Sequence, residues 1–186
     1  MDILISECRT EGLLFFDENK SLKLFEGTYP IIHIEEEVAK VFHEDPGFIL
    51  GTGNPKVRYH FYQRLGKLGG KLTTVQGQGV VKSGFSKVEE ADIFNLCFIG
   101  PNIQLGKGCL INTGAQIHHE VEIGDFTEVN PGAVILEGVQ IGSLSSIGAN
   151  ATILPKVKSR EYCSNRSRSV VTRDVVGVLG RIIQKN

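Results

Sequence analysis

Several features of common protein classes are missing from this sequence. It contains no tryptophan and one methionine, and it has no run of about 18 apolar residues that could span a bilayer. The first residues lack the pattern of a secretory signal. The formal net charge is −1, so no overall basic field favours nucleic acid or a membrane surface as a partner. These absences favour a cytoplasmic protein that binds neither.

Cysteine is present, but not in a motif. The four cysteines, Cys8, Cys97, Cys109 and Cys163, form no Cys-x-x-Cys pair. They could form disulfides, but reduced thiols are the simpler interpretation for a chain without a secretion signal. Glycine is abundant, with 22 residues against six prolines. This balance indicates many tight corners and not disorder.

The main positive signal is a six-residue repeat. Every sixth residue is aliphatic, without a gap, at Ile93, Ile99, Leu105, Ile111, Ile117, Ile123, Val129, Ile135, Ile141, Ile147 and Ile153. A period of six fits neither an amphipathic helix nor one simple strand. It fits short strands joined by corners, each with one aliphatic side chain inside, which is the hexapeptide β-helix pattern. Three hexads make one turn in that class, so residues eighteen apart should stack.

A second series supports the repeat. The residues four positions after each aliphatic one are small or β-branched from Cys109 to Val157. Glycine or asparagine often follows the aliphatic residue, as at Gly100 and Asn112, and should adopt the unusual backbone angles of a corner. The aliphatic series is interrupted at Ser159 and Asn165. These last coils are either a terminal cap or an altered ligand site.

The N-terminal part has a different pattern. Strands are expected over 12–17, 48–53 and 71–75, a helix over 35–43, and a second helix that Asn54 caps and Gly69 and Gly70 end. Val57, Phe61 and Leu65 should form the apolar face of that second helix. Alternating strands and helices predict a small parallel α/β unit. We therefore expect two domains, residues 1–78 and 79–186.

Ligands of parallel α/β sheets bind beyond the carboxyl ends of the strands. That rule points to Asp17 and to the turn 51–54. The alternative is that these are ordinary turn residues, since the turn is a weak motif and no Gly-x-Gly-x-x-Gly loop is present.

Within the repeats, the stretch His118-His119-Glu120 carries the strongest chemical signal. Because Ile117 points inward, His118 should occupy a corner and His119 should begin the next flat stretch. His119 beside Glu120 is a candidate general base with a partner, whereas the alternative is two surface histidines. Glu137 and Gly138 should stack beside this pair, and a backbone N–H there could stabilise an oxyanion.

A zinc site is the other chemical possibility for these histidines. Catalytic zinc needs three protein ligands and an open fourth position. The repeat region offers only the adjacent His118 and His119, which cannot easily point at one metal. No metal is expected.

Three stretches, residues 111–126, 131–134 and 169–174, resemble bacterial NeuD/PglD-like sugar acetyltransferases. The resemblance implies a mainly β fold, with a small Rossmann-like α/β domain followed by a left-handed parallel β-helix. It implies transfer of an acetyl group from acetyl-CoA to a sugar hydroxyl or to the amine of a nucleotide-linked amino sugar. It also implies a homotrimer with active sites between subunits.

The resemblance also assigns roles to residues. His119 would be the general base, Glu120 would raise its basicity, and the backbone of Glu137 would polarise the thioester carbonyl. Acetyl-CoA contact positions are Glu128, Ala149 and Ser167. Positions near the nucleotide-sugar are Asp17, Glu18 and Gly53.

The sequence departs from the family pattern at four places. One is the tail 175–186, which resembles a shortened form of the family's ending, with Leu179 where a proline is usual. Residues 1–7 resemble the helix that follows a glycine-rich phosphate loop, so a truncated nucleotide-sugar domain is expected. Glu128 stands where histidine is common, and Arg166-Ser167-Arg168 replaces a Gly-Ala-Gly-like corner. The alternative hypothesis is therefore a catalytically impaired β-helix that serves as a scaffold or binding protein.

Overall fold

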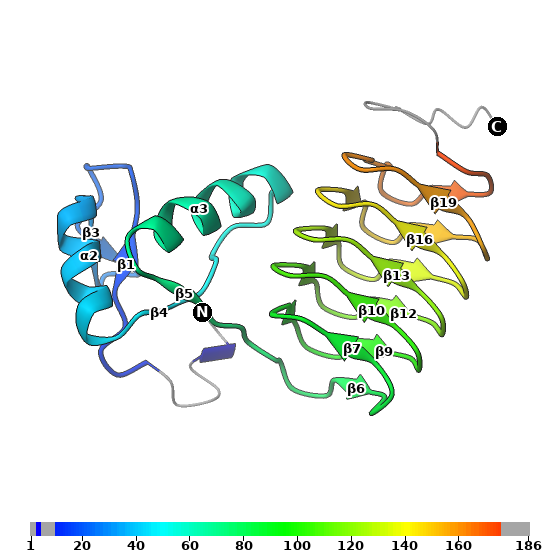
Figure 1. Cartoon of the computed structure of the whole chain (residues 1–186), viewed down its shortest axis with the longest axis horizontal. Helices are drawn as coiled ribbons and strands as arrows, with labels where there is room; N and C mark the ends of the chain where they lie inside the picture. The colour runs from blue at the N-terminus through cyan, green and yellow to red at the C-terminus, as the bar shows by residue number, and fades with distance from the viewer. Residues whose placement is uncertain (1–2, 5–9, 176–186) are drawn as a thin grey trace.

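The computed structural model of the chain describes residues 3–4 and 10–175. A small α/β unit lies beside a β-helix of stacked coils (Figure 1). The helix expected over residues 1–7 lies outside the described residues, apart from Ile3 and Leu4. Over the described ranges, none of the helices is both long and apolar enough to cross a membrane.

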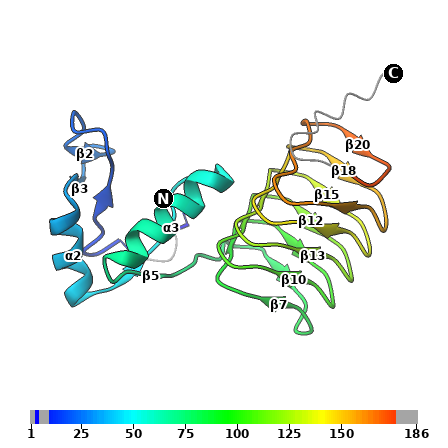
Figure 2. The same cartoon turned by 45° about the horizontal axis from the view of Figure 1, so that its top comes forward.

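The β-helix consists of two-residue strands that stack into three parallel sheets. Sheet 1 contains β6 (Val81–Lys82), β9 (Phe98–Ile99), β12 (Gln116–Ile117), β15 (Val134–Ile135), β18 (Thr152–Ile153) and β20 (Val170–Val171). Sheet 2 contains β7 (Lys87–Val88), β10 (Gln104–Leu105), β13 (Glu122–Ile123), β16 (Gln140–Ile141) and β19 (Lys158–Ser159). Sheet 3 contains β8 (Asp92–Ile93), β11 (Leu110–Ile111), β14 (Glu128–Val129) and β17 (Ser146–Ile147). Figure 2 labels β12, β15, β18 and β20 of sheet 1, stacked one above another.

The register confirms the predicted eighteen-residue coil. Ile117 pairs with Ile135, and Gln104 pairs with Glu122, both in parallel strands. The first coil is one residue shorter, since Val81 pairs with Phe98. The expected parallel β-helix is therefore confirmed.

The inward-pointing aliphatic residues form the core of the β-helix. Ile99, Ile111, Ile117 and Ile135 are completely buried, as is Ala115 of the second series. Each large aliphatic side chain contributes roughly 1.5–3 kcal/mol by leaving water. The stacked coils therefore share one continuous hydrophobic core.

We expected the glycines that follow the aliphatic residues to be needed for unusual backbone angles, and this reason was wrong. Left-handed backbone angles occur two residues further on, at positions such as Gly108 (φ +66°) and Phe126 (φ +52°). At Gly124, a Cβ atom would lie 2.6 Å from the Ser143 backbone nitrogen of the next coil. Glycine stands there because adjacent coils approach closely.

Each coil turns at three corners, which stack into columns. The His119 corner contains residues 101–102, 119–120, 137–138 and 155–156. The Phe126 corner contains residues 107–108, 125–126, 143–144 and 161–162. The Ala149 corner contains residues 95–96, 113–114, 131–132, 149–150 and 167–168.

The N-terminal unit contains two small sheets and two described helices. Its elements are β1 (Phe15–Phe16), β2 (Leu24–Phe25), β3 (Tyr29–Ile32), α2 (Glu35–Glu44), β4 (Gly47–Phe48), α3 (Pro55–Lys67) and β5 (Lys71–Leu72). β1 and β4 pair in parallel with β3 and β5, respectively, but β2 is antiparallel to β3. The described residues thus form an α/β unit, but its two separate sheets do not confirm a Rossmann-like domain.

Helix α3 begins as predicted but buries a different face. The Asn54 side chain accepts hydrogen bonds from the N–H groups of Lys56 (3.0 Å) and Val57 (3.2 Å), which satisfies the first turn. The helix ends at Lys67, just before Gly69. Leu65 is buried as expected, but Val57 is exposed and Arg58 is buried in its place. The expected apolar face was therefore wrong at its N-terminal end.

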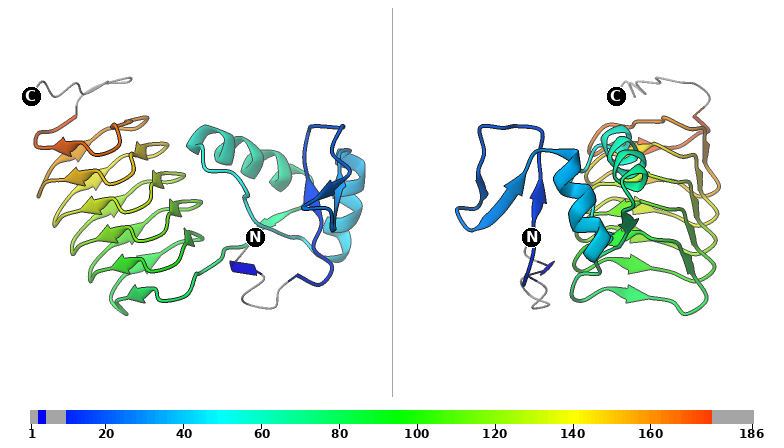
Figure 3. Two further views of the ribbon diagram at one scale, coloured as in Figure 1. Left: turned by 180° about the vertical axis from the view of Figure 1, so that it is seen from behind. Right: turned by 60° about the vertical axis from the view of Figure 1, so that its left-hand side comes forward.

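The α/β unit and the β-helix share a second hydrophobic cluster. Phe126 packs against Tyr59 and Tyr62 of α3, with ring centroids 5.1 Å apart in both pairs. Phe126 and Leu144 thereby extend the cluster formed by Phe48 and other buried residues of the α/β unit. Figure 3 shows α3 lying against one side of the β-helix, which is the side of the Phe126 corner.

Candidate functional site

The structure places His119 at a turn and not at the start of a flat stretch. Strand β12 ends at Ile117, His119 and Glu120 form the turn, and β13 begins only at Glu122. The predicted position was therefore off by a few residues. Glu120 has φ +61°, and this left-handed turn brings the two neighbouring side chains to the same corner.

His119 and Glu120 form a loose pair at this corner. The Nδ1 atom of His119 lies 3.7 Å from Oε2 of Glu120, within ion-pair range but too far for a hydrogen bond. Both side chains are more than half exposed, at 52% and 66%. Within residues 10–175, the Nε2 atom of His119 has no hydrogen-bond partner. The imidazole thus has a carboxylate near Nδ1 and, among the described residues, an open Nε2.

The residues expected to stack beside this pair do so. The Gly138 N–H donates to the His119 carbonyl oxygen over 3.1 Å, and the Lys156 N–H donates to the Glu137 carbonyl oxygen over 2.9 Å. In the described part of the chain, the Glu137 N–H itself has no acceptor. The corner therefore combines an accessible imidazole with the Glu137 N–H, which is free among the described residues.

Ala149 and Ser167 meet at the Ala149 corner, on the other edge of sheet 1. They stack one coil apart, since the Arg168 N–H donates to the Ala149 carbonyl oxygen over 2.8 Å. Ala149 is half-buried, and Ser167 is exposed together with Arg166 and Arg168. These expected acetyl-CoA contacts thus lie at a different corner from His119.

Glu128 and Gly53 come together at the junction between the α/β unit and the β-helix. Glu128 begins β14 and is half-buried, and its Oε2 atom accepts a hydrogen bond from the Ser146 hydroxyl over 3.2 Å. A Cβ atom on Gly53 would lie 2.6 Å from Oε1 of Glu128. The turn before α3 therefore packs directly on the outer face of sheet 3.

Asp17 and Glu18 lie in the loop after β1. The Asp17 side chain accepts a hydrogen bond from the Asn19 N–H over 2.7 Å. Glu18 forms an ion pair with Arg64, which also pairs with Glu35, and these two carboxylates raise the pKa of Arg64. Arg64 stands ten residues after Asn54 in α3, roughly 15 Å along the helix axis. Glu18 and Gly53 thus contact opposite ends of α3.

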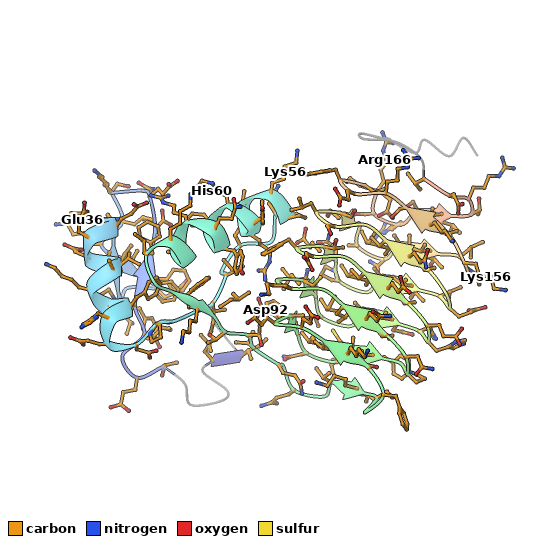
Figure 4. The ribbon with its side chains drawn as sticks, viewed as in Figure 1. Glu36, Lys56, His60, Asp92, Lys156 and Arg166 are labelled. Carbon is orange, nitrogen blue, oxygen red and sulfur yellow. The ribbon has the colours of Figure 1, made fainter. Side chains whose placement is uncertain are left out.

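The expected site residues therefore form four groups in one chain, of which Asp17 and Glu18, in the loop after β1, are the first. His119, Glu120 and Glu137 share one corner, Ala149 and Ser167 share another, and Glu128 and Gly53 meet at the junction. Figure 4 shows Asp92 on the side that faces the α/β unit and Lys156, which belongs to the His119 corner, on the far side. The His119 corner thus lies away from the chain's own α/β unit.

Sequence reasoning missed a buried ion pair at the junction. Arg58 of α3 and Asp92 of β8 are both 1% exposed, and Arg58 Nη2 lies 2.7 Å from Asp92 Oδ2. Burial raises the pKa of the Asp92 carboxyl, and the adjacent Arg58 charge partly offsets that effect. The only signal was the spacing of seven between Arg58 and Leu65, which places both residues on one helical face.

The described cysteines are buried thiols with no disulfide. Cys97, Cys109 and Cys163 are free, and Cys8 lies outside the described residues. Burial raises the pKa of Cys109 to about 12, so this thiol is not a nucleophile near neutral pH. In the range that the structure describes, no three His, Cys, Asp or Glu side chains gather as metal ligands would.

One family model matches part of the β-helix. The model of the bacterial transferase hexapeptide (six repeats) matches residues 120–155. That segment begins beside His119 and covers two complete coils. These two coils are thus similar to the repeats of that family, and the parallel strands of the chain match the β-helix fold of solved left-handed β-helix acyltransferases.

Three solved structures share the fold of almost the whole chain. The acetyltransferase domain of PglB from Neisseria gonorrhoeae, in complex with acetyl coenzyme A, is 18% identical, with a TM-score of 0.85 over 94% of this chain and 84% of that one. PerB from Caulobacter crescentus, in complex with CoA and GDP-perosamine, is 16% identical, with a TM-score of 0.78 over 89% and 91%. WeeI from Acinetobacter baumannii is 18% identical, with a TM-score of 0.64 over 94% and 86%. The resemblance to sugar acetyltransferases is therefore confirmed in the fold.

Proposed function

We propose that this chain is an acetyltransferase that moves an acetyl group from acetyl-CoA to a sugar or nucleotide-linked amino sugar, with His119 as the general base. The observation that carries the proposal is the His119 corner. There an imidazole faces a carboxylate through Nδ1 and lies one coil below the Glu137 N–H, and within residues 10–175 neither Nε2 nor that N–H has a partner. PglB and PerB, which share the fold, were solved with acetyl-CoA or CoA bound.

The reaction assigns one role to each of these groups. The amine or hydroxyl of the acceptor attacks the thioester carbonyl, forming the new C–N or C–O bond, and the C–S bond then breaks. Nε2 of His119 takes the proton of the acceptor, and the resulting imidazolium then gives that proton to the departing thiolate of CoA. Glu120 stabilises the imidazolium, and the Glu137 N–H donates to the oxyanion. General base catalysis of this kind contributes about 10²- to 10⁴-fold.

The remaining assignments follow the same proposal. Glu128, Ala149 and Ser167 contact acetyl-CoA, whereas Asp17, Glu18 and Gly53 contact the nucleotide-sugar. Because the His119 corner lies away from the α/β unit of its own chain, a second copy must complete each site. A homotrimer with sites between subunits satisfies that requirement.

The outer face of sheet 1 supports self-association. This face lies between the His119 and Ala149 corners, so copies that meet there would bring the two corners of different chains together. Val81, Phe98 and Val170 stand in its outward column and are 61%, 37% and 43% exposed. Burying these apolar side chains against another copy would remove them from water and so stabilise the association.

A catalytically silent scaffold is the second candidate. The observation that favours it is the irregular end of the β-helix, where Ser159 replaces an aliphatic residue. Its hydroxyl is buried with no nitrogen or oxygen partner among the described residues. The arginines at positions 166 and 168 also alter the corner at which acetyl-CoA would pack.

The first experiment measures CoA release from acetyl-CoA against a panel of amino sugars, nucleotide-linked amino sugars and sialic acid. We expect release that requires an acceptor. The substitution His119→Ala should lower kcat by about 10²- to 10⁴-fold and leave the fold intact, because it removes only the base.

The matched control is His118→Ala, the adjacent histidine, whose ring packs against Phe98 at 5.7 Å. Its kcat should stay within about threefold of the wild type, because it offers no base at the corner. Equal activity of the wild type and His119→Ala would overturn the mechanism. Saturable acetyl-CoA binding in a calorimeter counts against a scaffold, whereas a folded protein that neither binds acetyl-CoA nor releases CoA would establish one.

A further inference from the structure

The guanidinium of Arg58 connects three separate segments of the chain. Its Nη1 atom donates to the carbonyl oxygens of Leu50 (2.9 Å) and Thr52 (2.8 Å), in the turn that leads to Gly53. Its Nε atom donates to the carbonyl oxygen of Gly108 (3.0 Å), at the Phe126 corner. Nη2 binds Asp92, so the group uses its planar fork of donors almost completely.

Asp92 extends this network to the start of the β-helix. Its Oδ1 atom accepts a hydrogen bond from the Val75 N–H over 3.0 Å, while Oδ2 binds Arg58. Val75 stands between β5 and the first coil, at the passage from the α/β unit to the β-helix. One buried ion pair therefore holds the turn 50–54, the connection at Val75 and the wall of the β-helix together.

The turn that Arg58 holds is packed against Glu128 with no space to spare. Gly53 approaches Oε1 of Glu128 so closely that a Cβ atom there would overlap it. Glu128 is held from the other side by the Ser146 hydroxyl. A shift of the turn by even an ångström would change the distance between these two residues.

We propose that Arg58, through Asp92, is the positioning residue that keeps Gly53 against Glu128 and so sets the distance between the acceptor side and the donor side of the site. This inference rests on the proposed function, because only there do Gly53 and Glu128 contact substrates. Arg58 itself is 1% exposed and touches no substrate. It acts by fixing the turn and the β-helix in one arrangement.

The test compares two variants that lose the clamp in different ways. In R58K the charge is kept, but one ammonium cannot reproduce the planar fork. In the double variant R58M and D92L, apolar side chains replace the buried pair, an exchange that often preserves stability. The control is Lys67→Met, an exposed lysine at the end of the same helix with no ion pair among the described residues.

The first readout is hydrogen exchange, which does not depend on activity. Exchange at the amides of Lys56, Val57 and Val75, all hydrogen-bonded in the wild type, should accelerate about tenfold or more in both variants. Coils 115–157 should be unchanged. Faster exchange across those coils as well would make Arg58 a general structural residue and overturn the proposal.

The second readout separates the two substrates. KM for the acceptor should rise about tenfold, while KM for acetyl-CoA stays within about twofold, because only the turn assigned to the acceptor loses its fixed position. Unchanged exchange with unchanged KM values would also refute a positioning role. If the wild type releases no CoA with any acceptor, the proposed function fails, and exchange alone decides whether Arg58 holds the turn.

Discussion

Glycines in the β-helix are required for two different physical reasons. Some glycines have left-handed backbone angles, at which a residue with a Cβ atom is strained. Other glycines lie where neighbouring atoms leave no room for a Cβ atom. Gly108 and Gly114 have almost the same backbone, with φ of +66° and +71°. Their surroundings differ, because a Cβ atom at Gly108 would lie 2.3 Å from Cε1 of Phe126, whereas one at Gly114 would meet nothing within 4 Å.

This difference predicts unequal losses of stability. Gly114→Ala should lower the free energy of unfolding by about 1 kcal/mol, the cost of a left-handed alanine. Gly108→Ala should lower it by roughly 2–4 kcal/mol, because Phe126 must also move out of its cluster. Urea denaturation of both variants measures the two values. Similar losses at the two positions would show that Phe126 adjusts without cost.

At the scale of elements, the two described helices of the α/β unit begin in different ways. Helix α2 follows Ile34, whose side chain makes no capping bond, and it has three glutamates in its first turn. The positive end of the helix dipole stabilises these negative charges. Helix α3 has no acidic residue in its first turn and depends on the Asn54 cap. Because α3 also carries Arg58, this cap supports the contact with the β-helix.

The cap of α3 can be tested by one substitution and its conservative control. Asn54→Ala should lower the free energy of unfolding by about 1 kcal/mol, because two N–H groups lose their acceptor. Asn54→Asp keeps an acceptor at the same position and should stay within about 0.5 kcal/mol of the wild type. Chemical denaturation measures both variants. Equal stability of all three proteins would mean that water replaces the cap fully.

At the scale of the whole molecule, the α/β unit covers the Phe126 corner of the β-helix and the outer face of sheet 3 beside it. The outer face of sheet 1 has no partner within the described chain and carries exposed apolar residues. The His119 corner borders this face. The arrangement of one chain therefore leaves the proposed catalytic corner and the apolar face together, away from its own α/β unit.

The proposed homotrimer makes a direct prediction about this face. Phe98→Asp should weaken association at least about tenfold, because it places a charge in an apolar contact. Leu24→Asp is the control, since Leu24 is 50% exposed on the β2–β3 hairpin and should not change the mass. Light scattering over a concentration series measures both variants. A monomeric wild type would exclude the trimer and the site between subunits.

Local regularities made much of the fold predictable. The inward residues, the eighteen-residue coil and the Asn54 cap follow from spacing, because each depends on residues close in sequence or repeated at a fixed interval. The predicted position of His119 was less accurate, because the period does not show which residues of a hexad form the turn. The stacking of His119 under Glu137 followed correctly from the period alone.

The sequence by itself determined the β-helix, because one aliphatic residue in six can be buried only if short strands stack in register. Tertiary structure alone decided which side of it the α/β unit covers, that Arg58 and not Val57 is buried, and that Gly53 meets Glu128. Arg58 binds Gly108 across 50 positions and Asp92 across 34. No periodic pattern encodes such contacts, since they arise only when two separately folded surfaces pack and exclude water between them.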